Sequence, residues 1–580
     1  MKVVDSFPED VRVIENVWIP MSDGVHLAAR VWLPDNAEAE PVPAVLEYMP
    51  YRKRDFTRLR DEPLHHYFAG HGYASIRLDV RGTGDSEGIL RDEYLAQEQD
   101  DAVDAIDWIT RQSWCNGAVG MIGLSWGGFN SLQVAARRPP ALKAIITMCY
   151  ADDAHYKGGC LLTENLSWGS AFVALNACPP DPEIAGASWR GQWLERLERN
   201  RLFPALWMRH PHRDDYWRHG SVCEDYAAID CAVYAVGGGA DGYVNAIPRL
   251  MQGLSAPRKG LIGPWPHAFP HAAVPGPRIG FFQEAVRWWD HWLKGEDTGI
   301  MDEPLLRVWM EDWVGPAPYH EERPGRWVAE ETWPSPRIRP RHWHLNVMSL
   351  GERADAEDAM RVRSPQTTGL KGGDFYGFGA DGDAPLDQRE DDGRSLVFDS
   401  DPLPERLEIL GAPQVTLELA VDRPVAHVVV RLNDVGPDGT SARVSYGVLN
   451  LAHRDGHEQP QPLEPGRRYR VAVRLNDIGY AFPAGHTVRL AVSTAYWPMI
   501  WPAPEPVELT VFTGASRLEL PERPARAQDA ELPAFGAPER GPASEHTPLE
   551  MVNVQRIIEL DLTTDEGAGT RGFWAADGRG

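Results

Sequence analysis

The feature that most constrains the fold is a regular alternation of strand and helix patterns over roughly the first 145 residues. Short apolar runs typical of buried strands occupy residues 44–50, 74–80, 118–125 and 142–150. Segments with helical spacing of apolar residues lie between them, at 92–112 and 126–139. Strands that alternate with helices pair in parallel, because each helix carries the chain back along the sheet. The sequence therefore predicts an α/β fold with a parallel sheet flanked by helices.

Two changes of pattern divide the 580 residues into regions. Residues 148–228 are rich in Trp, Arg, Asn and Pro and return no strands at regular intervals, which predicts a helical cap inserted into the core. Strand patterns resume over 229–300 and complete the core that begins at 1–147. From 301 to 580, short alternating apolar runs are separated by Pro, Gly and Asp turns, which predicts a β-sandwich. Within it, the polar, glycine-rich segment 348–395 is expected to form a surface loop.

Charge and composition narrow the possible partners. The formal net charge of -26 disfavours a nucleic-acid partner, because binding phosphates requires clustered Lys and Arg. The sequence shows no signal-like N-terminus and no apolar stretch of membrane-spanning length, and its six cysteines are scattered without a C-x-x-C pair. We therefore expect a cytoplasmic protein that acts on a small molecule, makes no contact with a membrane, and uses neither a metal nor another cofactor. A homo-oligomer is compatible with the sequence.

A nucleophile motif lies at one of the predicted strand-to-helix junctions. Gly123-Leu124-Ser125-Trp126-Gly127 matches G-x-S-x-G, in which a strained turn lifts the serine hydroxyl clear of the backbone. Gly123 and Gly127 are expected there because larger side chains would collide where the strand and helix pack closely. Serine is also a favoured N-cap residue, so capping of the helix is the alternative role for Ser125.

Acid and base partners for Ser125 follow in the chain order of α/β-hydrolases. Asp241 and His267 each come just after a predicted strand, at the edge where open α/β sheets place their sites. A neutral imidazole can take the serine proton, and a carboxylate can hold the ring's tautomer and stabilise its charged form. Asp241 lies in a glycine-rich turn and could also be a simple turn residue. Nearby alternatives in the sequence are His271, Asp225 and Asp230.

Several segments resemble a known family. PYRKRD (50–55), DVRGTGDSEG (79–88), GLSWGG (123–128), the Asp241 turn and GPWPH (263–267) are similar to stretches of the cocaine-esterase and X-Pro dipeptidyl-peptidase-like serine hydrolases. The likeness continues through 430–454 and 480–498. It implies an α/β-hydrolase domain with a helical cap insertion, followed by a C-terminal jelly-roll β-sandwich. One departure is Gly238-Gly239-Ala240-Asp241, where the family commonly has Gly-Trp-x-Asp.

The same resemblance implies further site residues. It places an oxyanion hole at the backbone N–H of Trp126 and the hydroxyl of Tyr51, with Tyr48 as the alternative tyrosine. A similar tryptophan in cocaine-esterase relatives faces the acyl group, so Trp168 is the candidate for the acyl pocket.

Three functions are compatible with this pattern. The leading hypothesis is a serine hydrolase that cleaves carboxylic esters, or activated amides such as β-lactam side chains, through an acyl-enzyme on Ser125. The second is an X-Pro dipeptidyl-peptidase or a hydrolase of α-amino acid esters, which needs a site for an ammonium group. Asp152 and Asp153 follow a predicted strand and could supply it, although such a pair is also common in turns and helix caps. The third is a non-catalytic binding protein, against which a complete triad argues.

Overall fold

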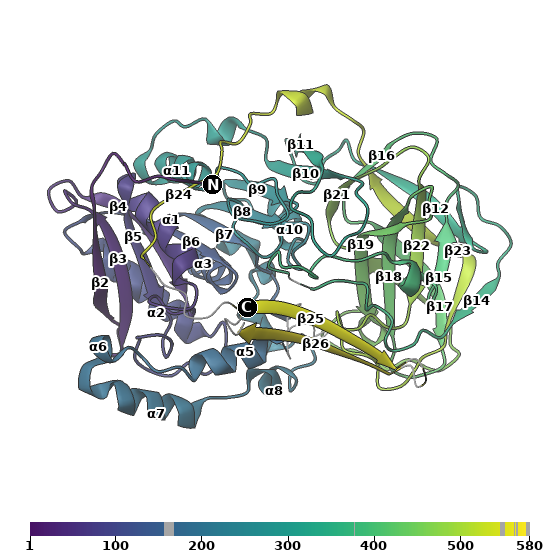
Figure 1. Ribbon diagram of the computed structural model, residues 1–580, viewed down its shortest axis with the longest axis horizontal. Coiled ribbons are helices and arrows are strands. Elements are labelled where there is room, and N and C mark those ends of the chain that lie inside the picture. Colours follow the sequence, from purple (N-terminus) through teal and green to yellow (C-terminus); the bar gives the residue numbers. More distant parts are fainter. Residues whose placement is uncertain (156–166, 376, 546–551, 562, 564–565, 576–580) are drawn as a thin grey trace, which may run out of the picture.

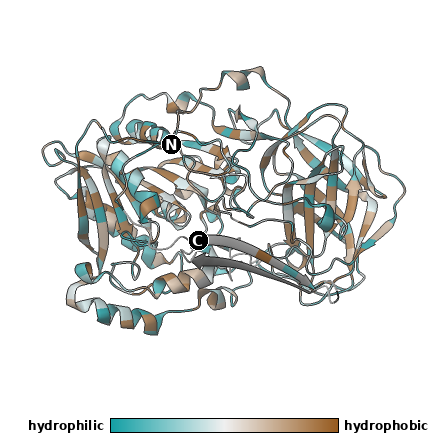
Figure 2. Cartoon of the chain, viewed as in Figure 1, coloured by the Kyte–Doolittle hydropathy of each residue, from teal (hydrophilic) through white to brown (hydrophobic). Residues whose placement is uncertain are grey.

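The computed structural model describes residues 1–155, 167–375, 377–545, 552–561, 563 and 566–575. Two lobes lie side by side in Figure 1: an α/β lobe formed by the first part of the chain and a β lobe formed by the second. Apolar residues gather on the strands of both lobes, and each lobe has a core of its own (Figure 2). Of the helices described, none combines the length and apolar character needed to cross a membrane.

One sheet forms the centre of the α/β lobe. Its strands, in spatial order, are β2 (Val11–Pro20), β3 (His26–Pro34), β5 (Ala74–Asp79), β4 (Val42–Met49), β6 (Cys115–Leu124), β7 (Leu142–Met148), β8 (Ala232–Gly238), β9 (Arg258–Gly263) and β10 (Leu306–Asp312). The pairs β2–β3 and β3–β5 are antiparallel, and all later neighbours are parallel. The parallel sheet predicted from the alternating pattern is therefore confirmed.

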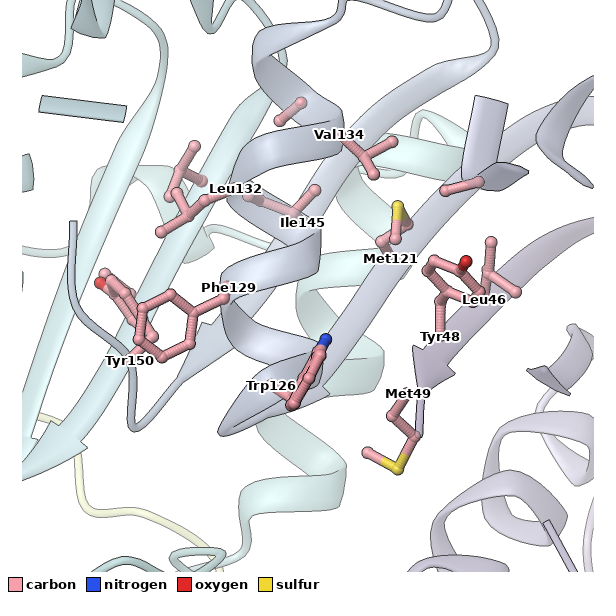
Figure 3. Close-up of a cluster of buried hydrophobic side chains, with 14 of the residues drawn as sticks. Leu46, Tyr48, Met49, Met121, Trp126, Phe129, Leu132, Val134, Ile145 and Tyr150 are labelled. Carbon is pink, nitrogen blue, oxygen red and sulfur yellow. The ribbon is translucent and has the colours of Figure 1, made fainter. Parts of the chain in front are cut away.

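Helices cover both faces of this sheet. One face carries α2 (Ala96–Thr110), α3 (Trp126–Ala136) and α10 (Ala246–Gly253), and the other carries α1 (Arg58–Gly70) and α11 (Phe281–Trp289). Successive strand residues enter different cores: Leu46 and Met121 join the core with α3, whereas Val45 and Ile122 join the core with α11. Figure 3 shows the core around α3. Burial on both faces explains why the central strands are nearly continuous apolar runs.

A helical insertion joins β7 to β8, where the cap is predicted. Its helices are α5 (Ser167–Asn176), α6 (Pro182–Ala185), α7 (Trp189–Arg199), α8 (Phe203–Trp207) and α9 (Asp215–Arg218). Residues 156–166 of the predicted cap lie outside the described part of the chain. Phe172, Phe203 and Trp207 are buried in the α3 core, so the insertion packs on the α/β lobe, along its lower edge in Figure 1.

The β lobe contains two sets of antiparallel strands. One set joins β20, β17 and β23, with β12 and β14 beside β23, and the other joins β15, β22, β18 and β19. Leu417 of the first set and Val430 of the second belong to one core, because alternate residues of each strand point inward. The bounds are β12 (Arg339–Asn346), β13 (Ser349–Gly351), β14 (Ala359–Val362), β15 (Leu396–Asp399), β16 (Leu407–Gly411), β17 (Gln414–Val421), β18 (His427–Val435), β19 (Ser441–Asn450), β20 (Tyr469–Arg474), β21 (Ile478–Phe482), β22 (Thr487–Ser493) and β23 (Leu509–Glu522).

The chain crosses between the lobes more than once. β10 follows the predicted boundary at residue 301, yet it extends the α/β sheet and also pairs with β11 (Gly325–Glu330). Later, β24 (Glu539–Arg540) returns to pair in parallel with β1 (Lys2–Val3). A hairpin of β25 (Val552–Asp561) and β26 (Glu566–Ala575) follows. The region 301–580 is therefore not confined to the β lobe.

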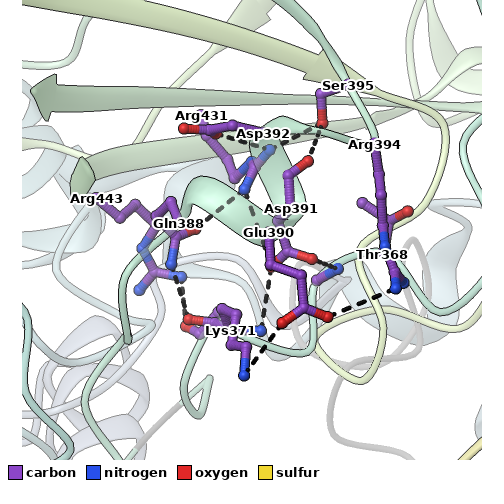
Figure 4. Close-up of polar contacts among 12 residues, drawn as sticks. Thr368, Lys371, Gln388, Glu390, Asp391, Asp392, Arg394, Ser395, Arg431 and Arg443 are labelled. Atoms are coloured by element: carbon purple, nitrogen blue, oxygen red, sulfur yellow. Dashed lines mark hydrogen bonds and ion pairs between the residues drawn. The ribbon is translucent and has the colours of Figure 1, made fainter. Parts of the chain in front are cut away.

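The segment 348–395 is only in part the surface loop that its composition predicts: residues 352–359 are exposed. It contains β13, β14 and the short helix α12 (Arg389–Asp392), and Gln388 and Asp392 are buried. As Figure 4 shows, these side chains surround Arg431 of β18. The Arg431 guanidinium donates to Gln388 at 3.1 Å and to Ser395 at 2.8 Å, and lies 3.2 Å from Asp392. The polar residues around Arg431 thus form a buried ion-pair network, since charges can be buried when they are paired.

Candidate active site

Ser125 joins β6 to α3 through a strained backbone. Its φ is 65°, a left-handed value that residues other than glycine rarely adopt, and its N–H donates to the Met148 carbonyl at 2.9 Å. The side chain makes no capping hydrogen bond to a described residue of α3, which leaves the capping alternative without support. Ser125 lines a cavity at the carboxyl edge of the sheet, as expected of a nucleophile elbow.

Close packing of α3 on β6 and β7 requires glycine at two positions. A Cβ on Gly123 would lie 2.2 Å from the carbonyl carbon of Gly127, and one on Gly128 would lie 2.5 Å from the Met148 carbonyl oxygen. Gly127 itself faces Met49 Cε at 3.4 Å, an ordinary contact. The predicted collision is therefore confirmed for Gly123 and wrong for Gly127, because the second tight position is Gly128.

Asp241 and His267 lie next to each other in the loops that follow β8 and β9. His267 Nδ1 is 3.3 Å from each carboxylate oxygen of Asp241, and both residues are buried. His267 also lines the cavity that contains Ser125. Because Nδ1 faces the carboxylate, proton exchange with a serine or substrate would use Nε2.

The alternative acid and base residues lie elsewhere. His271 packs on Phe282 with ring centroids 4.2 Å apart, and burial lowers the pKa of His271 to about 3. Asp225 accepts a hydrogen bond in a short helical turn, and Asp230 lies 3.9 Å from an arginine. The observed contact between acid and base thus follows the chain order predicted for a hydrolase.

A cavity of about 100 Å³ opens at Ser125. Aromatic and apolar side chains form most of its wall, which suits an apolar acyl or leaving group. Trp168 lies edge-on to Tyr51, with ring centroids 5.8 Å apart, so the structure brings both residues to Ser125 and His267. The lining residues are Tyr51, Phe56, Thr57, Arg60, Leu124, Ser125, Trp168, Tyr243, His267 and Phe378.

Tyr51, and not Tyr48, reaches the serine. The Tyr51 hydroxyl donates to Ser125 Oγ at 3.2 Å. Tyr48 is buried in the core beside α3 (Figure 3), and among the described residues its hydroxyl has no hydrogen-bond partner. Trp126 is the first residue of α3, so its backbone N–H has no acceptor within the helix. Two hydrogen-bond donors therefore lie next to Ser125.

Comparison with known proteins agrees with this geometry. Residues 23–269 match the X-Pro dipeptidyl-peptidase family S15, and residues 298–531 match the X-Pro dipeptidyl-peptidase C-terminal non-catalytic domain. The chain belongs to the cocaine-esterase and X-Pro dipeptidyl-peptidase-like serine hydrolases. Cocaine esterase of Rhodococcus sp. is 26% identical over 545 residues, which cover 84% of this chain and 91% of the relative.

Solved structures share the arrangement of this serine hydrolase. An α-amino acid ester hydrolase superposes with a TM-score of 0.68 at 22% identity, over 90% of this chain and 98% of its own. An aminopeptidase from the marine sediment archaeon Thaumarchaeota archaeon gives a TM-score of 0.70 at 20% identity, over 89% and 97%. These likenesses concern the fold, and they confirm a hydrolase lobe followed by a separate C-terminal domain.

Asp152 and Asp153 are neutralised by arginines. Arg249 Nε donates to both carboxylate oxygens of Asp152 at 2.9 Å, and Arg213 Nε donates to Asp153 at 3.0 Å. Neither aspartate is among the described residues that line the Ser125 cavity. A substrate ammonium would have to displace a guanidinium that is already bound, so this geometry argues against the predicted ammonium site.

A loop of the β lobe contributes to the site, and the sequence did not predict it. The Gly377 carbonyl accepts from the His267 N–H at 3.0 Å, and the Phe378 ring lies edge-on to the imidazole, with centroids 5.7 Å apart. Asp383 braces this loop by accepting from two of its backbone N–H groups, at 2.8 and 2.9 Å. The glycines and acidic residues in this part of the sequence indicate a turn. They do not indicate that the turn contacts the catalytic loop of the α/β lobe.

Cys149 touches the acid of the site. The Cys149 sulfur, an Asp241 carboxylate oxygen and a ring nitrogen of His267 lie within 4.8 Å of one another. Burial raises the pKa of the Cys149 thiol well above its usual range, and the negative charge of the nearby Asp241 raises it further. The thiol therefore stays protonated beside the carboxylate. Its only signal in the sequence is its place directly after β7.

Proposed function

We propose that this serine hydrolase cleaves small carboxylic esters or activated amides through an acyl-enzyme on Ser125. The proposal rests on one observation: Ser125, Tyr51 and His267 line the same cavity. Asp241 pairs with His267 directly behind it. A carbonyl group bound there would meet a nucleophile, a base and a hydrogen-bond donor together.

Each residue has a distinct role in the proposed reaction. Ser125 Oγ attacks the carbonyl carbon while His267 accepts its proton, and Asp241 stabilises the imidazolium without becoming protonated. The Tyr51 hydroxyl and the Trp126 N–H donate to the oxyanion as charge develops on it. His267 then protonates the leaving group, and the same imidazole activates the water that hydrolyses the acyl-enzyme.

We favour esters over substrates with a free α-ammonium group, and therefore over X-Pro peptides. The two carboxylates that could have bound such a group each pair with an arginine. Among the described residues, the cavity wall includes no carboxylate that could bind an ammonium group, and its cation, Arg60, pairs with Asp61. Trp168, Phe56 and Phe378 offer apolar contacts, which suit an uncharged acyl or leaving group.

We also infer that the β lobe is a jelly-roll sandwich that supports the site. Two sets of antiparallel strands around one core support this assignment. The hydrogen bond from His267 to Gly377 is the contact through which the lobe would hold the catalytic loop.

For a cytoplasmic location the support is that the five cysteines in the described part of the chain are free thiols.

A substrate panel tests the proposal. The kcat/KM values of p-nitrophenyl esters, phenylglycine esters and X-Pro p-nitroanilides are compared on one preparation, with Ser125→Ala as the control. We expect the p-nitrophenyl esters to have the highest values, and every activity to disappear in the variant. Faster cleavage of X-Pro anilides than of any ester would overturn the ester preference, and full activity of Ser125→Ala would overturn the acyl-enzyme.

A further inference from the structure

The tyrosine that contacts Ser125 sits in a loop with an unfavourable backbone. This loop, residues 50–57, joins β4 to α1, and it contains two non-glycine residues in the left-handed region: Arg52 at φ 63° and Phe56 at φ 48°. Such conformations persist only where surrounding contacts over-determine them. The contacts that hold this loop therefore fix where the Tyr51 hydroxyl lies.

Lys53, two residues after Tyr51, is held through both its backbone and its side chain. Its backbone N–H donates to Asp79 Oδ1 at 2.7 Å, and its ammonium donates to Asp85 Oδ2 at 2.5 Å. Asp79 Oδ2 in turn accepts from the Asp85 N–H at 3.0 Å. Lys53 is 0% exposed, Asp79 1% and Asp85 2%, so these contacts are shielded from water and from salt.

The segment around Asp79 is tightly packed and anchored to the sheet. Asp79 is the last residue of β5, which pairs with β4 directly before the Tyr51 loop. A Cβ on Gly84 would lie 2.1 Å from Asp79 Oδ2, so the turn closes directly on the carboxylate. Ser86 Oγ donates to the Asp79 carbonyl at 2.7 Å. These contacts leave the carboxylate little freedom to move.

The balance of charge among Lys53, Asp79 and Asp85 makes their contacts sensitive to the loss of any one of these three side chains. One ammonium faces two carboxylates in a buried space. Burial raises the pKa of Asp79 to about 6; Lys53 opposes this rise and Asp85 adds to it. Without Lys53, the two buried carboxylates would lose the ammonium that pairs with Asp85. The remaining buried cation near them, Arg196, donates to the Gly84 and Ser86 carbonyls instead. The lysine is thus required both by the loop backbone and by its acidic neighbours.

We propose that Lys53, Asp79 and Asp85 form a clamp that places the Tyr51 hydroxyl at the oxyanion site. They are positioning residues, because none of them is among the residues described around the cavity. The inference rests on the proposed function, in which Tyr51 stabilises the oxyanion. The clamp also reaches the cap: Asp85 Oδ1 accepts from the Asp181 N–H at 2.8 Å, and Asp181 caps α6.

Asp85→Asn is the sharpest test variant because it weakens one contact. When the amide oxygen accepts from the Asp181 N–H, the NH2 group replaces the oxygen that accepts from Lys53, so the hydrogen bond and the charge pair with Lys53 are lost. The matched control is Glu303→Gln, since Glu303 also pairs with a buried lysine of the α/β lobe, Lys259, at 2.8 Å. We expect Asp85→Asn to lower kcat about tenfold with KM changed less than about twofold, and Glu303→Gln to change neither.

A double-mutant cycle with Tyr51→Phe separates positioning from a general structural role. If the clamp acts through the Tyr51 hydroxyl, Asp85→Asn should change kcat less than about twofold once that hydroxyl is gone. The same tenfold loss in both backgrounds, or no loss with Tyr51 present, would overturn the clamp alone. A near wild-type kcat for Tyr51→Phe by itself would overturn the oxyanion assignment, and the clamp with it. Should Asp85→Asn fail to fold, Lys53→Met is tested in the same cycle and must show the same dependence on Tyr51.

Discussion

The two lobes bury charge in similar ways but with different consequences. In the α/β lobe, the clamp of Lys53, Asp79 and Asp85 lies beside the loop that carries Tyr51. In the β lobe, Arg431 is equally buried and joins β18 to α12 through the network in Figure 4. Both networks have desolvated charges that are paired and hydrogen-bonded. Because only the first network lies beside the loop that carries Tyr51, we expect its variants to change the reaction rate. Variants of the second network should change stability instead.

The lobes also contribute unequally to the cavity. Ser125, Asp241 and His267 all follow strands of the α/β sheet. From the β lobe, Phe378 is the one residue among those described that lines the cavity, and its loop holds the His267 backbone. The α/β lobe thus supplies the catalytic residues and most of the cavity wall, whereas the β lobe supplies one wall residue and a hydrogen bond to the His267 backbone.

The largest effect is expected for the acid and base. Asp241→Asn should lower kcat by roughly ten-thousand-fold, because the amide stabilises the wrong imidazole tautomer, and His267→Ala should lose several decades. Steady-state ester hydrolysis measures both, with thermal unfolding as the check that each variant folds. A mild His267→Ala beside a severely impaired His271→Ala would reassign the base.

The next effect is expected at the oxyanion donor. Tyr51→Phe should lower kcat on the order of a hundredfold with little change in KM, since its hydrogen bond strengthens only as charge develops. Tyr48→Phe is the matched control and should be near wild type, because that hydroxyl lies in the core. The reverse pattern would move the role to Tyr48.

A smaller effect is expected from the β lobe. Phe378→Ala should raise KM several-fold while kcat changes less than about threefold, since the ring lines the cavity but takes no part in proton transfer. Val347→Ala serves as the control: Val347 is 51% exposed in the same lobe, against 53% for Phe378. A kcat loss of several decades in Phe378→Ala would give the β lobe a chemical role and break the division.

No effect on rate is expected from the buried arginine of the β lobe. Arg431→Met should lower the free energy of unfolding by about 3–5 kcal/mol, because it leaves buried carboxylates unpaired, yet keep kcat within about twofold where the protein is folded. Urea unfolding with parallel activity measurements tests this. Arg467→Ala, which removes an exposed pair with Glu464, should leave the unfolding midpoint unchanged. A folded Arg431→Met enzyme with a large loss of kcat would show that the lobes are coupled.

What the sequence predicts well is local. Ser125, Asp241 and His267 could be located because each follows a strand whose apolar pattern is readable from a few neighbouring residues. Phe378 could not be placed, because its role depends on how two lobes pack. The partner of Asp152 could not be placed for the same reason, because Arg249 lies 97 residues further along the chain. A polar residue after an apolar run marks the end of a strand. The pattern does not show which charged side chain, distant in the sequence, will lie beside that residue in the folded protein.

In the proposed reaction, Ser125 is the residue that becomes acylated. Labelling with a fluorophosphonate, followed by mass spectrometry of peptides, tests it most directly. We expect a single adduct on the peptide that contains Ser125, and its loss in a Ser125→Ala variant that still unfolds at the wild-type temperature. An adduct on another residue, or undiminished labelling of Ser125→Ala, would contradict it.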